Sequence, residues 1–270
     1  MRIAIIVNPT KTGSAETLLT VQNKLSTYNN VEYFVSTDND FQIEIDLIFV
    51  VGGDGTLLLT VSKAVEHDVP VICFNTGKVG FLSEVDNISD VDRAIEKIMN
   101  SDYSIEERAL LEVKSEGRVY YALNEVSLMK NEFSSLIKTY VYKDDFSVTS
   151  FSADGIMVCT PTGSTAYSLS AGGPIMSPTM RAMLLTPVCA HVLFSRPMVF
   201  DGIEALKLGA ESPNGVIVSI DGVAIDKFTE KRFVEVTIAE KTLKLIKINH
   251  ESLYTKLQKK LLQWTVENKN

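Results

Sequence analysis

The chain has 270 residues, with 34 Asp and Glu against 26 Lys and Arg, so its formal net charge is −8. At roughly 150 residues per domain this length predicts two domains, and a composition of 45% hydrophobic and 22% charged residues is typical of a globular protein. The acidic balance excludes a general binder of nucleic acid or membrane surfaces, which needs a basic field. An anionic ligand must therefore be held by local geometry or by a metal.

The three cysteines, Cys73, Cys159 and Cys189, form an odd and widely spaced set without a CxxC pair. Neither a disulfide framework nor a zinc site is expected from them. The apolar run that opens the chain is too short for a signal-peptide core, and no stretch is long enough for a transmembrane helix. We therefore expect a cytoplasmic protein.

The first hundred residues alternate short Ile- and Val-rich runs with helical patterns. Strands are predicted at Arg2–Val7, Asp46–Val51 and Val69–Phe74, and helices at Ala15–Thr27, Leu57–His67 and Val91–Met99. Continuous apolar runs suit strands that are buried on both faces of a parallel sheet. This part of the chain, residues 1–102, is predicted to be a Rossmann-like α/β domain with sites at the C-terminal ends of its strands.

Further along, strand-like segments follow one another with turns between them. They are Leu110–Lys114, Val119–Met129, Lys138–Tyr142, Val216–Ile220, Phe233–Ile238 and Leu243–Ile248. Residues 103–250 are therefore predicted to form a β-sandwich-like domain. Leu253, Leu257 and Leu261 are spaced four apart, which predicts a helix over 251–270 that packs on the body of the protein.

Gly52-Gly53-Asp54-Gly55-Thr56 joins a predicted strand to a predicted helix that starts near Thr56. Glycines let the backbone turn tightly and leave room for a phosphate, and a helix N-terminus attracts an anion. A carboxylate here is explained if Asp54 accepts a proton from a hydroxyl or helps to hold a cation. The alternative is a simple strand–helix turn with Asp54 as the helix N-cap.

A longer polar block runs from Asp154 through the predicted strand Ile156–Cys159 and on to Pro174, and it is dense in Thr, Ser and Gly. Small hydroxyl side chains and bare backbone suit a close-fitting polar ligand such as a nucleotide. A surface loop would have the same composition, but the flanking apolar residues favour a partly buried segment.

Two further motifs accompany these. Asn124 and Glu125 interrupt an apolar strand, so they need partners if they are buried, or a bulge or an edge if they are exposed. The segment from Asn75 to Leu82 follows a predicted strand, and it should lie at the same sheet edge as Gly52–Thr56.

These motifs together closely resemble the NAD kinases, which phosphorylate the 2′-hydroxyl of the adenosine ribose of NAD. The resemblance runs nearly end to end. It rests on the Gly-Gly-Asp-Gly-Thr loop, the Gly-x-x-Gly-Phe-Leu pattern at Gly77–Leu82, the Asn-Glu pair and, most specifically, the block Asp154–Pro174. The glycine loop is shared with diacylglycerol and sphingosine kinases, whereas the Thr-Pro-Thr-Gly-Ser-Thr-Ala-Tyr block is not.

The resemblance implies a role for each matching residue. Asp54 would be the catalytic base, and the phosphates would be approached by Gly52, Gly53, Gly55 and Thr56. The NAD site would be lined by Phe81, Asn124, Glu125, Asp154, Thr165, Ala166, Tyr167, Ser168, Leu169 and Ser170. It also implies ATP or another phosphoryl donor, Mg²⁺ or another divalent metal carried with ATP, and a homodimer or homotetramer; it assigns no metal ligand.

The sequence departs from the family at Ser152, where many relatives carry Arg, and the loop Lys130–Leu136 matches no family pattern. Two alternatives stay open. A lipid kinase would share the glycine loop but not the long Ser/Thr block, and a non-catalytic dinucleotide-binding regulator would not need Asp54.

Overall fold

The computed structural model describes residues 1–38, 41–77, 80–133, 135–193, 195–249 and 255–258. The chain divides into two compact units. The first unit comprises Met1–Glu107 together with the chain from Leu243 onward, and the second comprises Arg108–Thr242. The two units are described one after the other.

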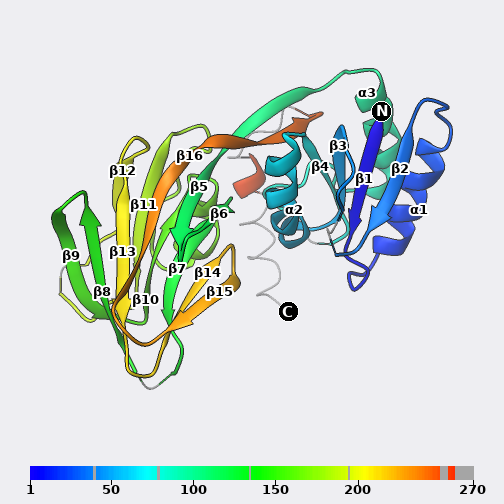
Figure 1. Ribbon diagram of the computed structural model, residues 1–270. Helices are drawn as coiled ribbons and strands as arrows, with labels where there is room; N and C mark the ends of the chain where they lie inside the picture. Colours follow the sequence, from blue (N-terminus) through cyan, green and yellow to red (C-terminus); the bar gives the residue numbers. More distant parts are fainter. Residues whose placement is uncertain (39–40, 78–79, 134, 194, 250–254, 259–270) are drawn as a thin grey trace, which may run out of the picture. The chain divides into compact units, whose positions relative to one another are not determined.

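The first unit is built on a parallel sheet with the strand order β2-β1-β3-β4 (Figure 1). The strands are β1 (Arg2–Val7), β2 (Glu32–Ser36), β3 (Leu47–Gly52) and β4 (Val71–Asn75). The end of the long strand β16 (Arg232–Lys247) adds a further parallel pairing, Leu245 with Val71. β3 and β4 are buried along their whole length, which explains their unbroken apolar sequences.

Three helices cover this sheet: α1 (Ser14–Leu25), α2 (Asp54–His67) and α3 (Val91–Met99), the last preceded by a short 3₁₀ turn, η1 (Ile88–Asp90). Helices α1 and α3 pack with Ile5, Phe49 and Phe74 in one hydrophobic core. α2 lies on the other side of the sheet, directly after β3 (Figure 1). The doubly covered parallel sheet that the sequence predicts is thus confirmed.

The second unit consists of two sheets. One is fully antiparallel, with the order β12-β11-β10-β7-β14-β15; the other joins β16, β13, β8 and β9, with β5 and β6 beside β16. The strands are β5 (Ser104–Ser115), β6 (Arg118–Ala122), β7 (Glu125–Lys130), β8 (Ile137–Lys143), β9 (Phe146–Ala153), β10 (Gly155–Cys159), β11 (Ala182–Val188), β12 (Met198–Asp201), β13 (Leu206–Glu211), β14 (Val216–Ile220) and β15 (Val223–Phe228).

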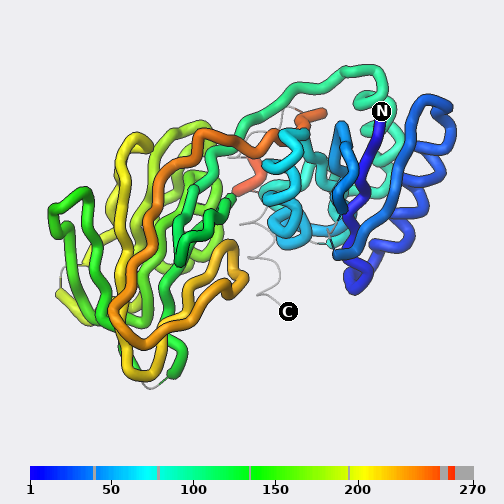
Figure 2. Tube along the Cα trace, in the orientation of Figure 1, coloured from blue at the N-terminus to red at the C-terminus, as the bar shows by residue number. Residues whose placement is uncertain are grey.

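A single core holds these two sheets together. Val126 and Val158 from one sheet share it with Val141, Leu208 and Val234 from the other. Figure 2 traces this unit as the green-to-orange part of the chain, folded in two layers of strands. The predicted β-sandwich is therefore confirmed.

Several sequence-based element bounds were wrong, for local reasons. The predicted strand Val119–Met129 is two strands, β6 and β7, because the chain turns at Leu123 and Asn124. Conversely, one strand, β16, replaces the two that were predicted at Phe233–Ile238 and Leu243–Ile248. Its exposed polar residues Glu240 and Lys241 interrupt the apolar pattern, but the strand continues through them. The strands β2, β9, β11, β12, β13 and β15 were not predicted.

The helix predicted over 251–270 falls mostly outside the described residues. Within the described part, residues 255–258 are helical, and Lys256 is buried with its Nζ donating to the backbone carbonyl of Ser83. Residues 255–258 belong to the first unit. A helix over the whole of 251–270 that packs back on the N-terminal domain stays a prediction.

Candidate active site

The glycine loop and the loop after β4 meet at the C-terminal edge of the parallel sheet, as the sequence predicts. Gly52 pairs with Asn75 at the ends of β3 and β4, and the N–H of Thr76 donates to the carbonyl of Gly52 at 3.1 Å. Gly52 is required sterically, because a Cβ there would stand 2.3 Å from the Oγ1 of Thr56. The loop thus turns directly into the first turn of α2.

Asp54 is the first residue of α2, and Gly53 is the N-cap. The expected helix start near Thr56, and the alternative of Asp54 as N-cap, were therefore wrong. The carboxylate instead accepts two backbone hydrogen bonds from another segment, at 2.8 Å from the N–H of Phe81 and at 3.2 Å from the N–H of Leu82. A carboxylate can accept about four hydrogen bonds, so both oxygens keep capacity for a hydroxyl proton.

The segment from Gly80 to Asp86 lies against both Asp54 and β4. The N–H groups of Glu84 and Val85 donate to the carbonyl of Cys73, and the carbonyl of Val85 accepts from Asn75. The side chain of Asn75 also donates to Asp86 at 3.0 Å. The first unit therefore brings Asp54, Gly52, Gly53, Thr56 and Phe81 together.

Thr56 is buried, and its Oγ1 has no hydrogen-bond partner within the described part of the chain. A hydroxyl that is taken out of water without a partner is unfavourable. It lies in the first turn of α2, where the helix dipole favours an anion. This turn has the chemistry of a phosphate site.

In the second unit, Asp221 organises the turn that carries Asn124. Its carboxylate accepts from the N–H groups of Leu123 at 2.8 Å, Asn124 at 2.7 Å and Glu125 at 3.0 Å. The Asp221 N–H returns a bond to the carbonyl of Glu125 at 2.9 Å. One aspartate far along the chain thus satisfies the backbone N–H groups of the Asn-Glu pair.

The polar block Asp154–Pro174 also contacts the turn at Leu123 and Asn124. The Oγ1 of Thr160 donates to the carbonyl of Leu123 at 2.5 Å and accepts from the N–H of Gly163 at 3.0 Å. A Cβ at Gly163 would stand 2.1 Å from the carbonyl oxygen of Asn124, so only glycine fits there. Asn124 is consequently fixed by its backbone from both sides.

Glu125 of the second unit has a buried carboxyl group with a raised pKa. It is 8% exposed, and its Oε2 has no hydrogen-bond partner among the described residues. Burial, and to a lesser extent the charge of Asp221, raises the pKa of Glu125 from 4.5 to about 7. Burial also raises the pKa of Asp221, against the opposing effect of the backbone N–H groups that it accepts. Glu125 can therefore change its charge near neutral pH.

The remaining predicted residues occupy the start and the helical end of the polar block. Asp154 forms an ion pair with Lys130 at 2.6 Å. Tyr167 is 43% exposed, whereas Ser168 is fully buried, and its hydroxyl shares a 2.8 Å hydrogen bond with Thr186. The second unit collects in this block the predicted residues Asp154, Thr165, Ala166, Tyr167, Ser168, Leu169 and Ser170.

Sequence reasoning missed Asp221 and Lys256 as organising residues. Asp221 stands in an Asp-Gly turn, where it has a φ of 47°. The pair is a turn signal, and Ser219–Gly222 also resembles the family's late strand, but neither pattern predicts a partner for the Asp221 carboxylate. Lys256 had no sequence signal, because it lies between Thr255 and Leu257 in a lysine-rich segment, where nothing distinguishes it from a solvated lysine. Both residues act on partners about a hundred or more positions away.

Within the described part of the chain, no group of three or more His, Cys, Asp or Glu residues is arranged to hold a metal ion. The same part contains no helix that is long and apolar enough to cross a membrane.

A glycine loop at the C-terminal edge of a parallel sheet, followed by a helix N-terminus that suits a phosphate, together with a separate β-sandwich, is typical of a two-domain nucleotide-binding enzyme. Matches to known families make this specific. The family model for the ATP-NAD kinase N-terminal domain matches residues 10–103, and the model for the ATP-NAD kinase C-terminal domain matches residues 123–248. The chain therefore belongs to the NAD kinase family.

Individual relatives agree with this assignment. The NAD kinase of Caldicellulosiruptor bescii is 38% identical over 264 residues, covering 97% of this chain and 99% of that protein. The NAD kinase of Heliobacterium modesticaldum is 41% identical over 82% of this chain and 80% of its own length. These matches do not favour the alternative of a lipid kinase, and they identify the protein as an enzyme, a phosphotransferase of the NAD kinase type.

Two solved structures share the fold. Yeast NADH kinase complexed with NADH superposes with a TM-score of 0.84 at 22% identity, covering 97% of this chain and 87% of that one. An NAD kinase from Archaeoglobus fulgidus in complex with ATP superposes with a TM-score of 0.77 at 24% identity, covering 96% of this chain and 98% of that one.

Proposed function

We propose that this protein transfers the γ-phosphoryl group of ATP to the 2′-hydroxyl of the adenosine ribose of NAD, with Asp54 as the general base. The oxygen of the hydroxyl forms the new bond to phosphorus, its proton passes to a carboxylate oxygen of Asp54, and ADP leaves. The observation that carries this assignment is the carboxylate of Asp54, held at the glycine loop by the N–H groups of Phe81 and Leu82. Proton transfer to a positioned base is worth typically about 10² to 10⁴ in rate.

The phosphates of the donor are assigned to the glycine loop and the first turn of α2. Gly52, Gly53 and Gly55 present backbone without Cβ atoms, and the buried hydroxyl of Thr56 supplies a donor that has no protein acceptor among the described residues. Phosphoryl transfer is catalysed mostly by positioning and by neutralising charge on the transferred group. The acidic chain therefore binds an anionic donor through N–H groups rather than through a basic surface.

A divalent metal, Mg²⁺ by default, is proposed to accompany the triphosphate. Mg²⁺ usually keeps several waters and binds through one or two carboxylates together with substrate phosphates. The carboxylate of Asp54, beside the glycine loop, is of the kind that such a set of donors uses, and no metal ligand is assigned. When bound, the metal neutralises negative charge on the triphosphate.

NAD is assigned to residues of the second unit, with Phe81 from the first. Asn124 is fixed by its backbone, and Glu125 and Asp154 offer carboxyl oxygens that accept hydrogen bonds from ribose hydroxyls. In its ionised form, Glu125 also repels a phosphate already present there. The remaining proposed contacts come from Thr165, Ala166, Tyr167, Ser168, Leu169 and Ser170. This arrangement supports a preference for NAD over analogues that already carry a 2′-phosphate. We further propose a cytoplasmic homodimer or homotetramer.

The test is a direct assay with the purified full chain. The chain is incubated with NAD, Mg²⁺ and, in separate reactions, ATP, another nucleoside triphosphate and polyphosphate. NADP is then detected with a strictly NADP-dependent dehydrogenase. NADP formed with ATP supports the proposal, NADP formed only with polyphosphate corrects the donor, and no NADP with any donor overturns the assignment.

A further inference from the structure

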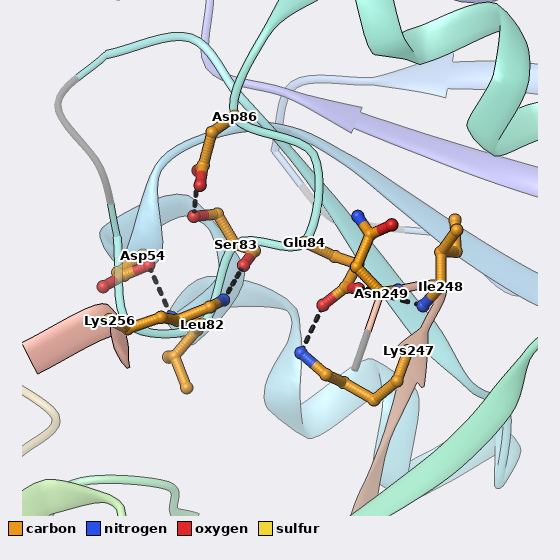
Figure 3. A network of polar contacts seen from close by, with 9 residues as sticks. All are labelled: Asp54, Leu82, Ser83, Glu84, Asp86, Lys247, Ile248, Asn249 and Lys256. Atoms are coloured by element: carbon orange, nitrogen blue, oxygen red, sulfur yellow. Dashed lines mark hydrogen bonds and ion pairs between the residues drawn. The ribbon is translucent and has the colours of Figure 1, made fainter. Parts of the chain in front are cut away.

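The segment Phe81–Glu84, here called the clamp segment, is anchored at four consecutive residues. Phe81 and Leu82 donate their N–H groups to Asp54. The carbonyl of Ser83 accepts from the Nζ of Lys256, and Glu84 accepts from the end of β16 (Figure 3). One end of the clamp segment thus holds Asp54, and the other end is held by the C-terminal part of the chain.

Glu84 makes the firmer of the two C-terminal anchors. Its side chain is 4% exposed; it pairs with Lys247 and accepts from the N–H groups of Ile248 at 2.9 Å and Asn249 at 2.7 Å. A buried carboxylate with one cation and two backbone donors is strongly fixed, because removing any of these partners leaves charge uncompensated. Glu84 therefore ties the clamp segment to the sheet through β16.

Lys256 makes the second anchor, beside the proposed base itself. The residue is 4% exposed, and Figure 3 shows its side chain lying beside Asp54 and Leu82 with Nζ directed to the carbonyl of Ser83. Lysine is almost never buried to this degree unless its ammonium is paired. Burial, and to a lesser extent the charge of Asp54, raises the pKa of the Cys73 thiol, and the charge of Lys256 opposes this rise. A buried ammonium is thus used here to hold the residue that follows Leu82.

We propose that Lys256 and Glu84 are positioning residues of the kinase reaction: they hold the clamp segment so that Phe81 and Leu82 keep the carboxylate of Asp54 in one orientation. This inference rests on the proposed role of Asp54. Neither residue has to touch a substrate. Their effect reaches the reaction through the two backbone N–H groups that Asp54 accepts.

Because atoms are closely packed around Asp54, a small displacement of the clamp segment should change the position of its carboxylate. A Cβ at Gly80 would stand 2.1 Å from the Oδ1 of Asp54 and 3.0 Å from the Oγ of Ser83. Gly80, which directly precedes the clamp segment, therefore lies too close to Asp54 for a side chain to fit without a shift. A shift of about 1 Å in such a site can cost about 100-fold in rate, so a loosened clamp segment is expected to lower turnover.

The test uses Lys256→Met, which keeps the length of the side chain and removes its charge, together with Lys256→Arg. The matched control is Lys24→Met, which removes another partly buried lysine of the first unit, paired with Glu96 between α1 and α3. We expect Lys256→Met to lower kcat by about 10- to 100-fold with the KM for NAD nearly unchanged, Lys256→Arg to restore part of the loss, and Lys24→Met to keep kcat.

Two further measurements separate positioning from general destabilisation. Amide hydrogen exchange should rise in the peptide that contains the clamp segment in Lys256→Met, but not in Lys24→Met. In an Asp54→Asn background, Lys256→Met should cause no further loss of kcat, because a residue that acts through the Asp54 carboxylate has nothing left to position.

Unchanged exchange of the clamp segment in Lys256→Met, an equal loss of kcat in the Asp54→Asn background or an equal loss in Lys24→Met would each overturn the inference. If the wild-type chain forms no NADP, the proposed function fails, and the exchange measurement still decides whether Lys256 holds the clamp segment.

Discussion

Gly80 packs against Asp54 so closely that a Cβ at position 80 would stand 2.1 Å from the Oδ1 of Asp54. The contact joins the first turn of α2 to the loop that follows β4, and the next two residues, Phe81 and Leu82, donate their N–H groups to the same carboxylate. Two backbone N–H groups thus orient the carboxylate of Asp54, and a backbone donor needs no flexible side chain to be ordered when the substrates bind.

Gly80→Ala is expected to lower kcat about tenfold or more while the protein remains folded, because the new methyl group must displace the carboxylate of Asp54 or the loop. Steady-state kinetics and a thermal unfolding curve measure the two effects. Gly77→Ala is the control, since a Cβ there meets no described atom within 4 Å. Wild-type kcat in Gly80→Ala would show that the orientation of Asp54 does not limit the reaction.

Asp54→Asn is expected to lower kcat by about 10² to 10⁴, because the amide cannot take the hydroxyl proton. One amide oxygen can still accept a backbone N–H, so the thermal midpoint should fall only slightly. Asp46→Asn serves as the control, since Asp46 also accepts a backbone N–H, from Arg2 at 2.7 Å, in the same unit. Full turnover in Asp54→Asn would refute its assignment as the base.

Asp221→Asn is expected to raise the KM for NAD about tenfold and to lower the free energy of unfolding by about 1–3 kcal/mol. The asparagine has fewer acceptor sites for the three N–H groups of Leu123, Asn124 and Glu125, and its NH₂ group opposes one of them. Initial rates over a range of NAD concentrations and denaturant titrations provide the two values.

Asp226→Asn in the neighbouring strand β15 controls for loss of a carboxylate, because Asp226 pairs with Arg232 outside this turn. An unchanged KM in Asp221→Asn, or an equal change in Asp226→Asn, contradicts the role of Asp221 in presenting Asn124.

The stability of the protein should depend on pH through Glu125. Its pKa is about 7 in the folded chain against 4.5 for the ordinary group, so the folded state binds more protons than the unfolded state between those values. The stabilisation is fully present below pH 4.5 and is lost as the pH rises through about 7, by about 3 kcal/mol at most.

Glu125→Gln, which cannot ionise, should lack this dependence of stability on pH and should be more stable than the wild type at pH 8. Denaturant titrations from pH 5 to 8 test this, and identical slopes for the two proteins would contradict the raised pKa.

Features that depend on residues close together in the sequence were predictable, and features that depend on distant residues were not. The Ile- and Val-rich runs of β1, β3 and β4 were predictable, because a strand buried on both faces leaves a continuous apolar signature. The turn at Leu123 and Asn124 was not, because its backbone donors are satisfied by Asp221, which is 97 positions away from Asn124. The polar residues in the middle of β16 likewise led to the prediction of two strands where the structure has one.

The sequence by itself determined the two-domain class, the glycine loop after β3, the polar block and, through its motifs, the NAD kinase family. These properties are local: glycines, hydroxyls and apolar runs within about twenty residues of one another specify them. Only the tertiary structure decided that Asp54 begins α2 and turns its carboxylate to Phe81 and Leu82 instead of capping the helix. It also decided that Asp221 binds the turn at Asn124 in the second unit and that, in the first unit, Glu84 and Lys256 join the loop after β4 to the C-terminal part of the chain. Hydrogen bonds between residues far apart in the chain leave no periodic trace in the sequence, because each depends on where the folded backbone places one donor and one acceptor.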